Sequence, residues 1–229
     1  MSGNAILAGQ VVLVTGAAGG IGQAIVAAIE EAGGSTVGFD LAQGDVSRDD
    51  DVRQVVETAI KDHGRLDAVV HAAGITRDQV LWKLSPEDWD QVQQVNLRSA
   101  FLLLRHSVPL MRQAGSGSFV LLGSINGSRG KFGQTAYAAS KAGLIGLARS
   151  AARETGRFGI RVNVVEPGMV RTPMTATLPP EVIAAAEQET LLGRLAEPQD
   201  IAAAVLFLCG PGSAHITGQV IRVDGGQYL

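Results

Sequence analysis

Three polar side chains in the second half of the chain have the types and the spacing needed for proton transfer coupled to hydride transfer. Ser124 follows the apolar run 119–123, and Tyr137 and Lys141 lie four residues apart in a long run of small residues. In a helix this spacing places both side chains on one face. A phenol has an ordinary pKa of about 10, and a neighbouring ammonium favours its ionised form. Tyr137 could therefore exchange a proton with a carbonyl oxygen that Ser124 holds.

Each of these side chains also has a purely structural interpretation. A serine can end a strand, a tyrosine can fill a core, and a lysine is most often a solvated surface charge. The catalytic interpretation is favoured for the three together, because each is expected at the carboxyl end of a strand or on the helix that follows it. Open α/β sheets bind their ligands at that edge.

The N-terminal part of the chain supplies the clearest strand and helix for such an edge. Residues 11–14 are apolar and β-favouring, a glycine-rich stretch stops them, and apolar residues then recur at helical spacing. Glycines let the backbone approach a pyrophosphate closely at the positive end of a helix, so we interpret the turn as a dinucleotide cradle. A glycine turn without a ligand is the alternative. The glycines fit two spacings, G-x-x-x-G-x-G through Gly16, Gly20 and Gly22, and G-x-x-G-x-x-G through Gly16, Gly19 and Gly22.

Asp40 ends the second predicted strand, residues 35–39. An acidic side chain at this place accepts hydrogen bonds from the ribose diol of NAD and repels the 2′-phosphate of NADP. Residues 17–43 contain no Arg or Lys that could neutralise such a phosphate. The sequence therefore predicts NAD rather than NADP, with a simple turn-forming role for Asp40 as the alternative.

The connection after Asp40 is too short for a helix. Only residues 41–44 separate Asp40 from Asp45, whereas a parallel crossover needs about a dozen residues or more. The sheet is therefore predicted to be truncated beyond its second strand, with Asp45 and Val46 brought directly to the adenine site. The next helix is predicted to have Ser47 as its N-cap and Gly64 as its stop.

Strand and helix patterns alternate along the rest of the chain. They predict an α/β fold, a doubly wound parallel sheet of about six strands in a single domain over residues 1–229. The Pro-punctuated segment 172–199 is predicted to form a lid over the substrate pocket. Further strands are expected at 66–71, 119–123, 160–165 and 218–223, and further helices at 86 to about 104, 137 to about 158, 180–189 and 201–208.

Composition argues against several classes of partner. A net charge of −3 without runs of like charge argues against nucleic acid and anionic membranes, and no apolar run is long enough to span a bilayer. The single Cys209 cannot form an internal disulfide, and the N-terminal residues lack the features of a secretory signal, so a cytoplasmic location is predicted. The four histidines have no ligand spacing, so no metal site is expected.

These motifs, in this order, resemble those of the short-chain dehydrogenase/reductase family in its compact single-domain branch, and the resemblance covers nearly the whole chain. Residues 15–22 resemble the cofactor motif, residues 71–74 the Asn-Ala-Gly motif, residues 137–141 the Tyr-x-x-x-Lys motif and residues 167–168 the Pro-Gly turn. The longer sugar-nucleotide epimerase branch fits less well because the chain has no room for its extra C-terminal region.

The resemblance implies a Rossmann-type fold and a role for each site residue. Tyr137 would be the general acid/base, Ser124 would orient the substrate oxygen, and Lys141 would bind the nicotinamide ribose and lower the tyrosine pKa. Asn96, which lies within a predicted helix between two apolar residues, would be buried and would maintain a water-linked proton path. The residues expected to contact the cofactor are Gly16, Gly20, Ile21, Gly22, Asp40, Asp45, Val46, Ala72, Ala73, Gly74, Tyr137, Lys141, Pro167, Gly168, Val170 and Thr172.

Within the family, residues 74–78 and 217–226 look most like those of 3-oxoacyl-carrier-protein reductases and acetoacetyl-CoA reductases. Three features depart from them: Asp40 favours NAD, residues 115–118 lack the basic side chains often found there, and His71 replaces the usual Asn. The predicted function is therefore an NAD(H)-dependent interconversion of a secondary alcohol and a ketone.

The substrate is less determined than the reaction. A 3-oxoacyl or 3-hydroxyacyl thioester is one expectation, and a cyclic alcohol or dihydrodiol is the alternative. A non-catalytic nucleotide-sensing protein on the same fold is the alternative of another class, but such proteins commonly lose the Tyr or the Lys that this chain keeps. A homotetramer is the family expectation, with the long helices and the C-terminal strand at its interfaces.

Overall fold

Strand β1 (Val11–Thr15) lies inside the sheet and is buried at all five residues, as its apolar run predicts. The computed structural model describes residues 5–173 and 175–229. Its six strands are parallel and lie in the order β2-β1-β3-β4-β5-β6. The other five strands are β2 (Ser35–Phe39), β3 (Ala68–His71), β4 (Gly117–Leu122), β5 (Ile160–Pro167) and β6 (Val220–Val223).

The strand order reverses next to β1. The chain passes from β1 outward to β2, then returns to the other side of β1 to form β3. Such a switch point opens a ligand crevice at the carboxyl ends of the strands. Because β2 is the edge strand, the predicted truncation of the sheet beyond it is confirmed.

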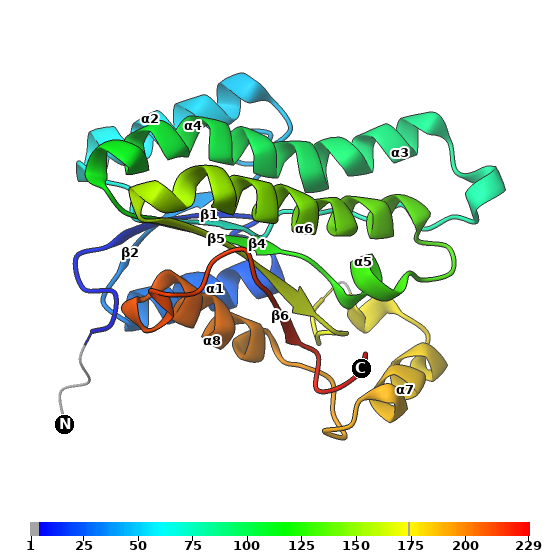
Figure 1. Ribbon diagram of the computed structural model, residues 1–229. Helices are drawn as coiled ribbons and strands as arrows, with labels where there is room; N and C mark the ends of the chain where they lie inside the picture. The colour runs from blue at the N-terminus through cyan, green and yellow to red at the C-terminus, as the bar shows by residue number, and fades with distance from the viewer. Residues whose placement is uncertain (1–4, 174) are drawn as a thin grey trace.

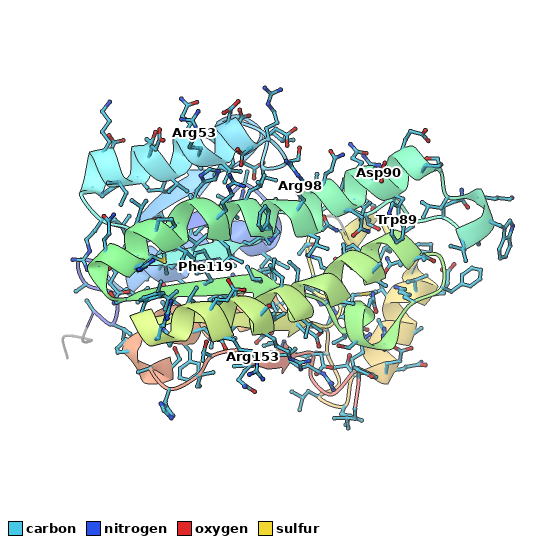
Figure 2. All side chains as sticks on the ribbon, turned by 45° about the horizontal axis from the view of Figure 1, so that its top comes forward. Arg53, Trp89, Asp90, Arg98, Phe119 and Arg153 are labelled. Atoms are coloured by element: carbon cyan, nitrogen blue, oxygen red, sulfur yellow. The ribbon has the colours of Figure 1, made fainter. Side chains whose placement is uncertain are left out.

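Two layers of helices cover the sheet, with α2, α4 and α6 on one face and α1 and α8 on the other (Figure 1). Alternate residues of each strand face opposite layers: Leu13 packs with the first group of helices, and Val12 and Val14 pack with the second. Phe119 on β4 is fully buried beneath the first layer, whereas Arg153 lies on the outer surface of α6 (Figure 2). The helices are α1 (Gly20–Glu31), α2 (Asp49–His63), α3 (Pro86–Gln93), α4 (Ser99–Ala114), α5 (Ile125–Arg129), α6 (Thr135–Thr155), α7 (Pro180–Glu189) and α8 (Pro198–Cys209).

The predicted start of α2 is wrong by one residue. The N-cap is Arg48, not Ser47, and it makes no side-chain capping bond. The reason is local: the Asp45 carboxylate accepts hydrogen bonds from both the backbone N–H and the hydroxyl of Ser47, at 2.8 and 2.7 Å, so this serine belongs to the preceding turn. Gly64 ends the helix in the left-handed conformation, as predicted.

The helix predicted from residue 86 to about 104 is present, but its α-helical pattern is interrupted. Ser85 caps α3 by accepting from the Asp88 N–H, but residues 94–98 form a π-helical turn before α4 begins. A π-turn accommodates an extra residue and is found mostly at functional sites. Asn96 lies within this turn and is fully buried.

The segment predicted as a lid contains α7 at its expected bounds, preceded by the short 3-10 turn Thr175–Thr177. Figure 1 shows α7 at the same end of the molecule as α5. The segment therefore extends beside the carboxyl end of the sheet.

Candidate active site

The turn after β4 and the start of α6 bring Ser124 and Tyr137 into contact. Ser124 is the N-cap of the short helix α5 and is 8% exposed, while Tyr137 lies in the first turn of α6 and is partly buried. Burial raises the pKa of the Tyr137 phenol, and a hydrogen bond with the Ser124 hydroxyl counteracts part of that rise. The two groups form a hydroxyl pair at the carboxyl edge of the sheet.

Lys141 lies one turn further along α6 and is buried. Its ammonium donates to the Leu122 carbonyl at 2.7 Å, and Nζ lies 5.6 Å from the centre of the Tyr137 ring. Burial lowers the pKa of Lys141 to about 8. The Ser124 hydroxyl is the group seen to lower the tyrosine pKa in this arrangement, and a lowering by Lys141 stays a prediction.

Asn96 is held by three hydrogen bonds. Its amide donates to the Ile75 carbonyl at 2.9 Å and to the Ser140 hydroxyl at 3.0 Å, and its Oδ1 accepts from the Ile75 N–H at 2.8 Å. Gly74 lies against it, since a Cβ at Gly74 would be 3.4 Å from both Asn96 Oδ1 and Lys141 Nζ. Asn96 therefore joins the strand end after β3 to the face of α6 that carries Lys141.

The glycine turn lies at the switch point between β1 and β3. Gly16 has φ of +67°, and a Cβ there would be 2.7 Å from the Ala73 backbone nitrogen. The Ala73 N–H donates to the Thr15 hydroxyl at 3.3 Å. A side chain at Gly16 would thus collide with the backbone after β3, so this turn needs glycine, and the start of α1 stays open to a phosphate.

Asp40 lies beside this turn. Its Oδ2 accepts from the Ala18 N–H at 2.9 Å, and its Oδ1 accepts from the Leu41 N–H at 2.8 Å. The carboxylate is therefore fixed next to the cradle, on the side of the edge strand. Among the described residues no Arg or Lys forms an ion pair with it.

The remaining residues expected near a cofactor lie around the same edge. Ile21 packs into the apolar cluster beneath α1, and Val46 packs against the opposite cluster. Pro167 ends β5, and Thr172 lies close to the cradle, since a Cβ at Gly20 would be 3.3 Å from Thr172 Cβ. The Thr175 hydroxyl holds the start of the lid segment by donating to the Val170 carbonyl at 2.7 Å.

Sequence reasoning missed a polar chain beside Tyr137. The Gln134 amide donates to Asp78 at 2.9 Å and accepts from Asn126 at 3.0 Å, and Asp78 contributes to the raised pKa of Tyr137. Asn126 also accepts from Arg129 at 3.0 Å, which pairs with Glu189 at the end of α7. Only the position of Asn126, two residues after Ser124, offered a signal in the sequence.

His71, which replaces the family's usual Asn, is fully buried. Its Nε2 lies 2.6 Å from the Ser99 hydroxyl, and burial together with the nearby Lys141 charge lowers its pKa to about 3. His71 is therefore neutral near pH 7. It contributes a hydrogen bond inside the core rather than a titrating group.

Two kinds of feature are absent from residues 5–173 and 175–229. No helix in them is long and apolar enough to cross a bilayer. Within the same ranges, no group of three or more His, Cys, Asp or Glu side chains is placed to hold a metal ion.

Known proteins match this chain along almost its full length. A family profile described as enoyl-(acyl carrier protein) reductase matches residues 8–227. The chain is 39% identical to 3-oxoacyl-[acyl-carrier-protein] reductase FabG of Thermotoga maritima, over 97% of this chain and 99% of the relative.

Two other relatives are similar to the same extent. The acetoacetyl-CoA reductase of Acinetobacter sp. is 38% identical over 96% of this chain and 98% of its own length. The (3R)-3-hydroxyacyl-CoA dehydrogenase of Canis lupus familiaris is 38% identical over 95% of each chain. With the fold and these matches together, the chain belongs to the short-chain dehydrogenase/reductase family and is an oxidoreductase that acts on CH–OH groups.

Proposed function

We propose that this enzyme interconverts a 3-oxoacyl thioester and the corresponding 3-hydroxyacyl thioester, with NAD(H) as cofactor and Tyr137 as general acid/base. The observation that carries the proposal is the hydroxyl pair of Ser124 and Tyr137, with the Lys141 ammonium one turn away. The names of the three relatives support the substrate class, because each refers to a thioester of a 3-oxo or 3-hydroxy acid.

In the reduction, Ser124 holds the substrate carbonyl by donating a hydrogen bond to its oxygen. The Tyr137 phenol then donates its proton to that oxygen as negative charge develops on it. A nicotinamide cofactor, when bound, would supply the hydride for the carbonyl carbon. The buried Lys141 ammonium stabilises the phenolate that remains, and Asn96 keeps the strand end after β3 in place against α6.

Asp40 is the basis for proposing NAD(H) rather than NADP(H). Its carboxylate lies at the cradle with no cationic partner among the described residues, so it would accept hydrogen bonds from a ribose diol and repel a 2′-phosphate. The other residues that would hold the cofactor are the cradle glycines, residues 72–74, Pro167, Gly168, Val170 and Thr172, with Asp45 and Val46 on the adenine side. Segment 172–199 would cover the substrate.

We also propose a cytoplasmic homotetramer without nucleic-acid or membrane partners, in which the long helices and β6 form the interfaces. Phe101 on α4 and Phe207 on α8 support it, because each exposes close to half of its side chain, 46% and 45%. Light scattering after size exclusion tests the assembly. A tetramer has four times the 23.8 kDa mass of one chain.

The substrate and the cofactor are tested in one assay. Acetoacetyl-CoA, a 3-oxoacyl carrier-protein thioester and a panel of cyclic alcohols and dihydrodiols are each assayed with NAD(H) and NADP(H). Turnover of the thioesters with NADH is the expected result. Faster turnover of a cyclic alcohol would favour the alternative substrate class, and no turnover of any substrate despite NADH binding would favour a nucleotide-sensing protein.

A further inference from the structure

A buried carboxylate next to the site has no role in the reaction described above. Glu166 on β5 is 0% exposed. Its Oε1 accepts from the Ser128 hydroxyl at 2.8 Å, whereas Oε2 makes no hydrogen bond and lies 3.5 Å from Arg222 Nε. Burying a carboxylate costs free energy unless its partners compensate. The incomplete pairing of Glu166 therefore suggests that it is kept for something other than stability.

Glu166 joins the two segments that line the reacting edge of the sheet. It directly precedes Pro167 and Gly168, and it bonds to Ser128 on α5, the helix that Ser124 caps. Its stem also packs beneath the residue before Ser124, since a Cβ at Gly123 would be 3.2 Å from Glu166 Cγ.

Helix α5 depends on such an anchor because it has only five residues. A helix of this length has little stability of its own in water. The hydrogen bond from Ser128 ties its last turn to β5, and the Gly127 N–H bonds back to the Ser124 carbonyl at 2.9 Å. A change at Ser128 is therefore transmitted to the orientation of the Ser124 hydroxyl.

We propose that Glu166 and Ser128 are positioning residues for Ser124, and this inference rests on the proposed function. They hold the Ser124 hydroxyl where it can bond to the Tyr137 phenol. The charged groups around Glu166 are Arg222 on β6 and Arg149 on α6, which line the same surface hollow of about 490 Å³. Those facing Tyr137 are Lys141 and Asp78. None of these four charged groups is on α5. Among the described residues, Glu166 is joined to α5 by the hydrogen bond from the Ser128 hydroxyl.

The test uses the pH profile of alcohol oxidation, in which Tyr137 acts as the base. Because the Ser124 hydrogen bond lowers the pKa of Tyr137, its loss should move the acid limb of kcat/KM to higher pH. We expect S128A to shift this limb in the same direction as S124A and to lower kcat by about 10-fold, a fraction of the effect of removing a donor from the substrate oxygen. The KM for NAD should stay within about 2-fold.

Two further variants separate positioning from stability. E166Q keeps an acceptor for Ser128 and should retain the wild-type midpoint of the limb, whereas E166L should shift it as S128A does. The control is S118A. Ser118 is buried on β4, and the variant removes the 2.8 Å hydrogen bond from its hydroxyl to the Leu208 carbonyl. It should lower Tm by a similar amount to S128A without moving the limb.

A double variant gives the decisive outcome. If Ser128 acts through Ser124, S124A/S128A should have the same pH profile as S124A alone. A further shift in the double variant, or an unshifted limb in S128A, would overturn the positioning role. If S124A itself left turnover unchanged, the proposed function would fail instead.

Discussion

The two ends of the candidate site are built from different kinds of contact. At the predicted catalytic end, Asn96 and Lys141 are almost fully buried and are bonded to residues 19 to 44 positions away in the sequence. At the predicted adenosine end, Asp40 and Asp45 are only partly buried, and most of their bonds lie within six residues. The proposed catalytic residues are thus anchored in the core, while the residue proposed to select the cofactor lies on a short surface turn.

The largest expected effect comes from a substitution at the buried, catalytic end of the site. Y137F removes the acid/base and should lower kcat by about 10³-fold or more, since general acid/base catalysis contributes about 10²- to 10⁴-fold. NADH affinity, measured by fluorescence titration, should change by less than about 2-fold. Y228F, at the chain's other tyrosine, is the matched control. Retained turnover in Y137F would remove the assignment of Tyr137 as the base.

The buried ammonium predicts a pH dependence of stability. Because the pKa of Lys141 is about 8 in the folded protein and 10.5 when unperturbed, the unfolded chain binds the extra proton between these values. The contribution of Lys141 to the free energy of unfolding should therefore rise with pH from about 8 to about 10.5, by up to about 3 kcal/mol. Denaturant unfolding of wild type and K141M, measured across this pH range, isolates the contribution of Lys141. Parallel curves for the two proteins would show that Lys141 is not desolvated.

The exposed end should change cofactor preference without loss of fold. D40S removes the charge that would repel a 2′-phosphate, so the ratio of kcat/KM with NADPH to that with NADH should rise by about 10- to 100-fold. D62S, which removes an exposed acid on α2, is the control and should leave the ratio unchanged. A wild-type enzyme that already prefers NADPH would contradict the role given to Asp40.

The smallest expected effect concerns the turn before α2. Because Ser47 does not cap this helix, S47A should cost less than about 0.5 kcal/mol of stability. S85A removes a true N-cap of α3 and should cost about 1 kcal/mol. Urea unfolding of both variants checks the difference. Equal costs would restore Ser47 as a capping residue.

Local spacing was enough to predict the parallel sheet, its truncation beyond the second strand and the helix face that Tyr137 and Lys141 share. The four-residue spacing of Tyr137 and Lys141 and the short connection after Asp40 are properties of neighbouring residues, and both predictions agree with the structure. The bounds of α7 follow from the proline at its start and the helical pattern after it.

Contacts between distant segments could not be read in this way. The bond from Ser128 to Glu166 and the chain from Asp78 through Gln134 to Asn126 each join segments that only the folded sheet brings together. The hydrogen bond from the Lys141 ammonium to the Leu122 carbonyl and the one between Ser124 and Tyr137 were missed for the same reason, since spacing shows that Lys141 is near Tyr137 but not how each polar group is directed.

The π-helical turn at Asn96 also fixes how the two halves of this long helix are aligned. An α-helix rotates about 100° per residue, whereas a π-turn rotates less per residue, so this turn takes up one extra residue and leaves the apolar faces of α3 and α4 aligned. Deleting one residue from 94–98 should therefore restore a regular α-helix with both faces kept, but it would move the Asn96 amide away from Ile75 and Ser140. This turn is therefore a length constraint that is invisible in composition, because the position of one buried amide depends on a single extra residue in the helix.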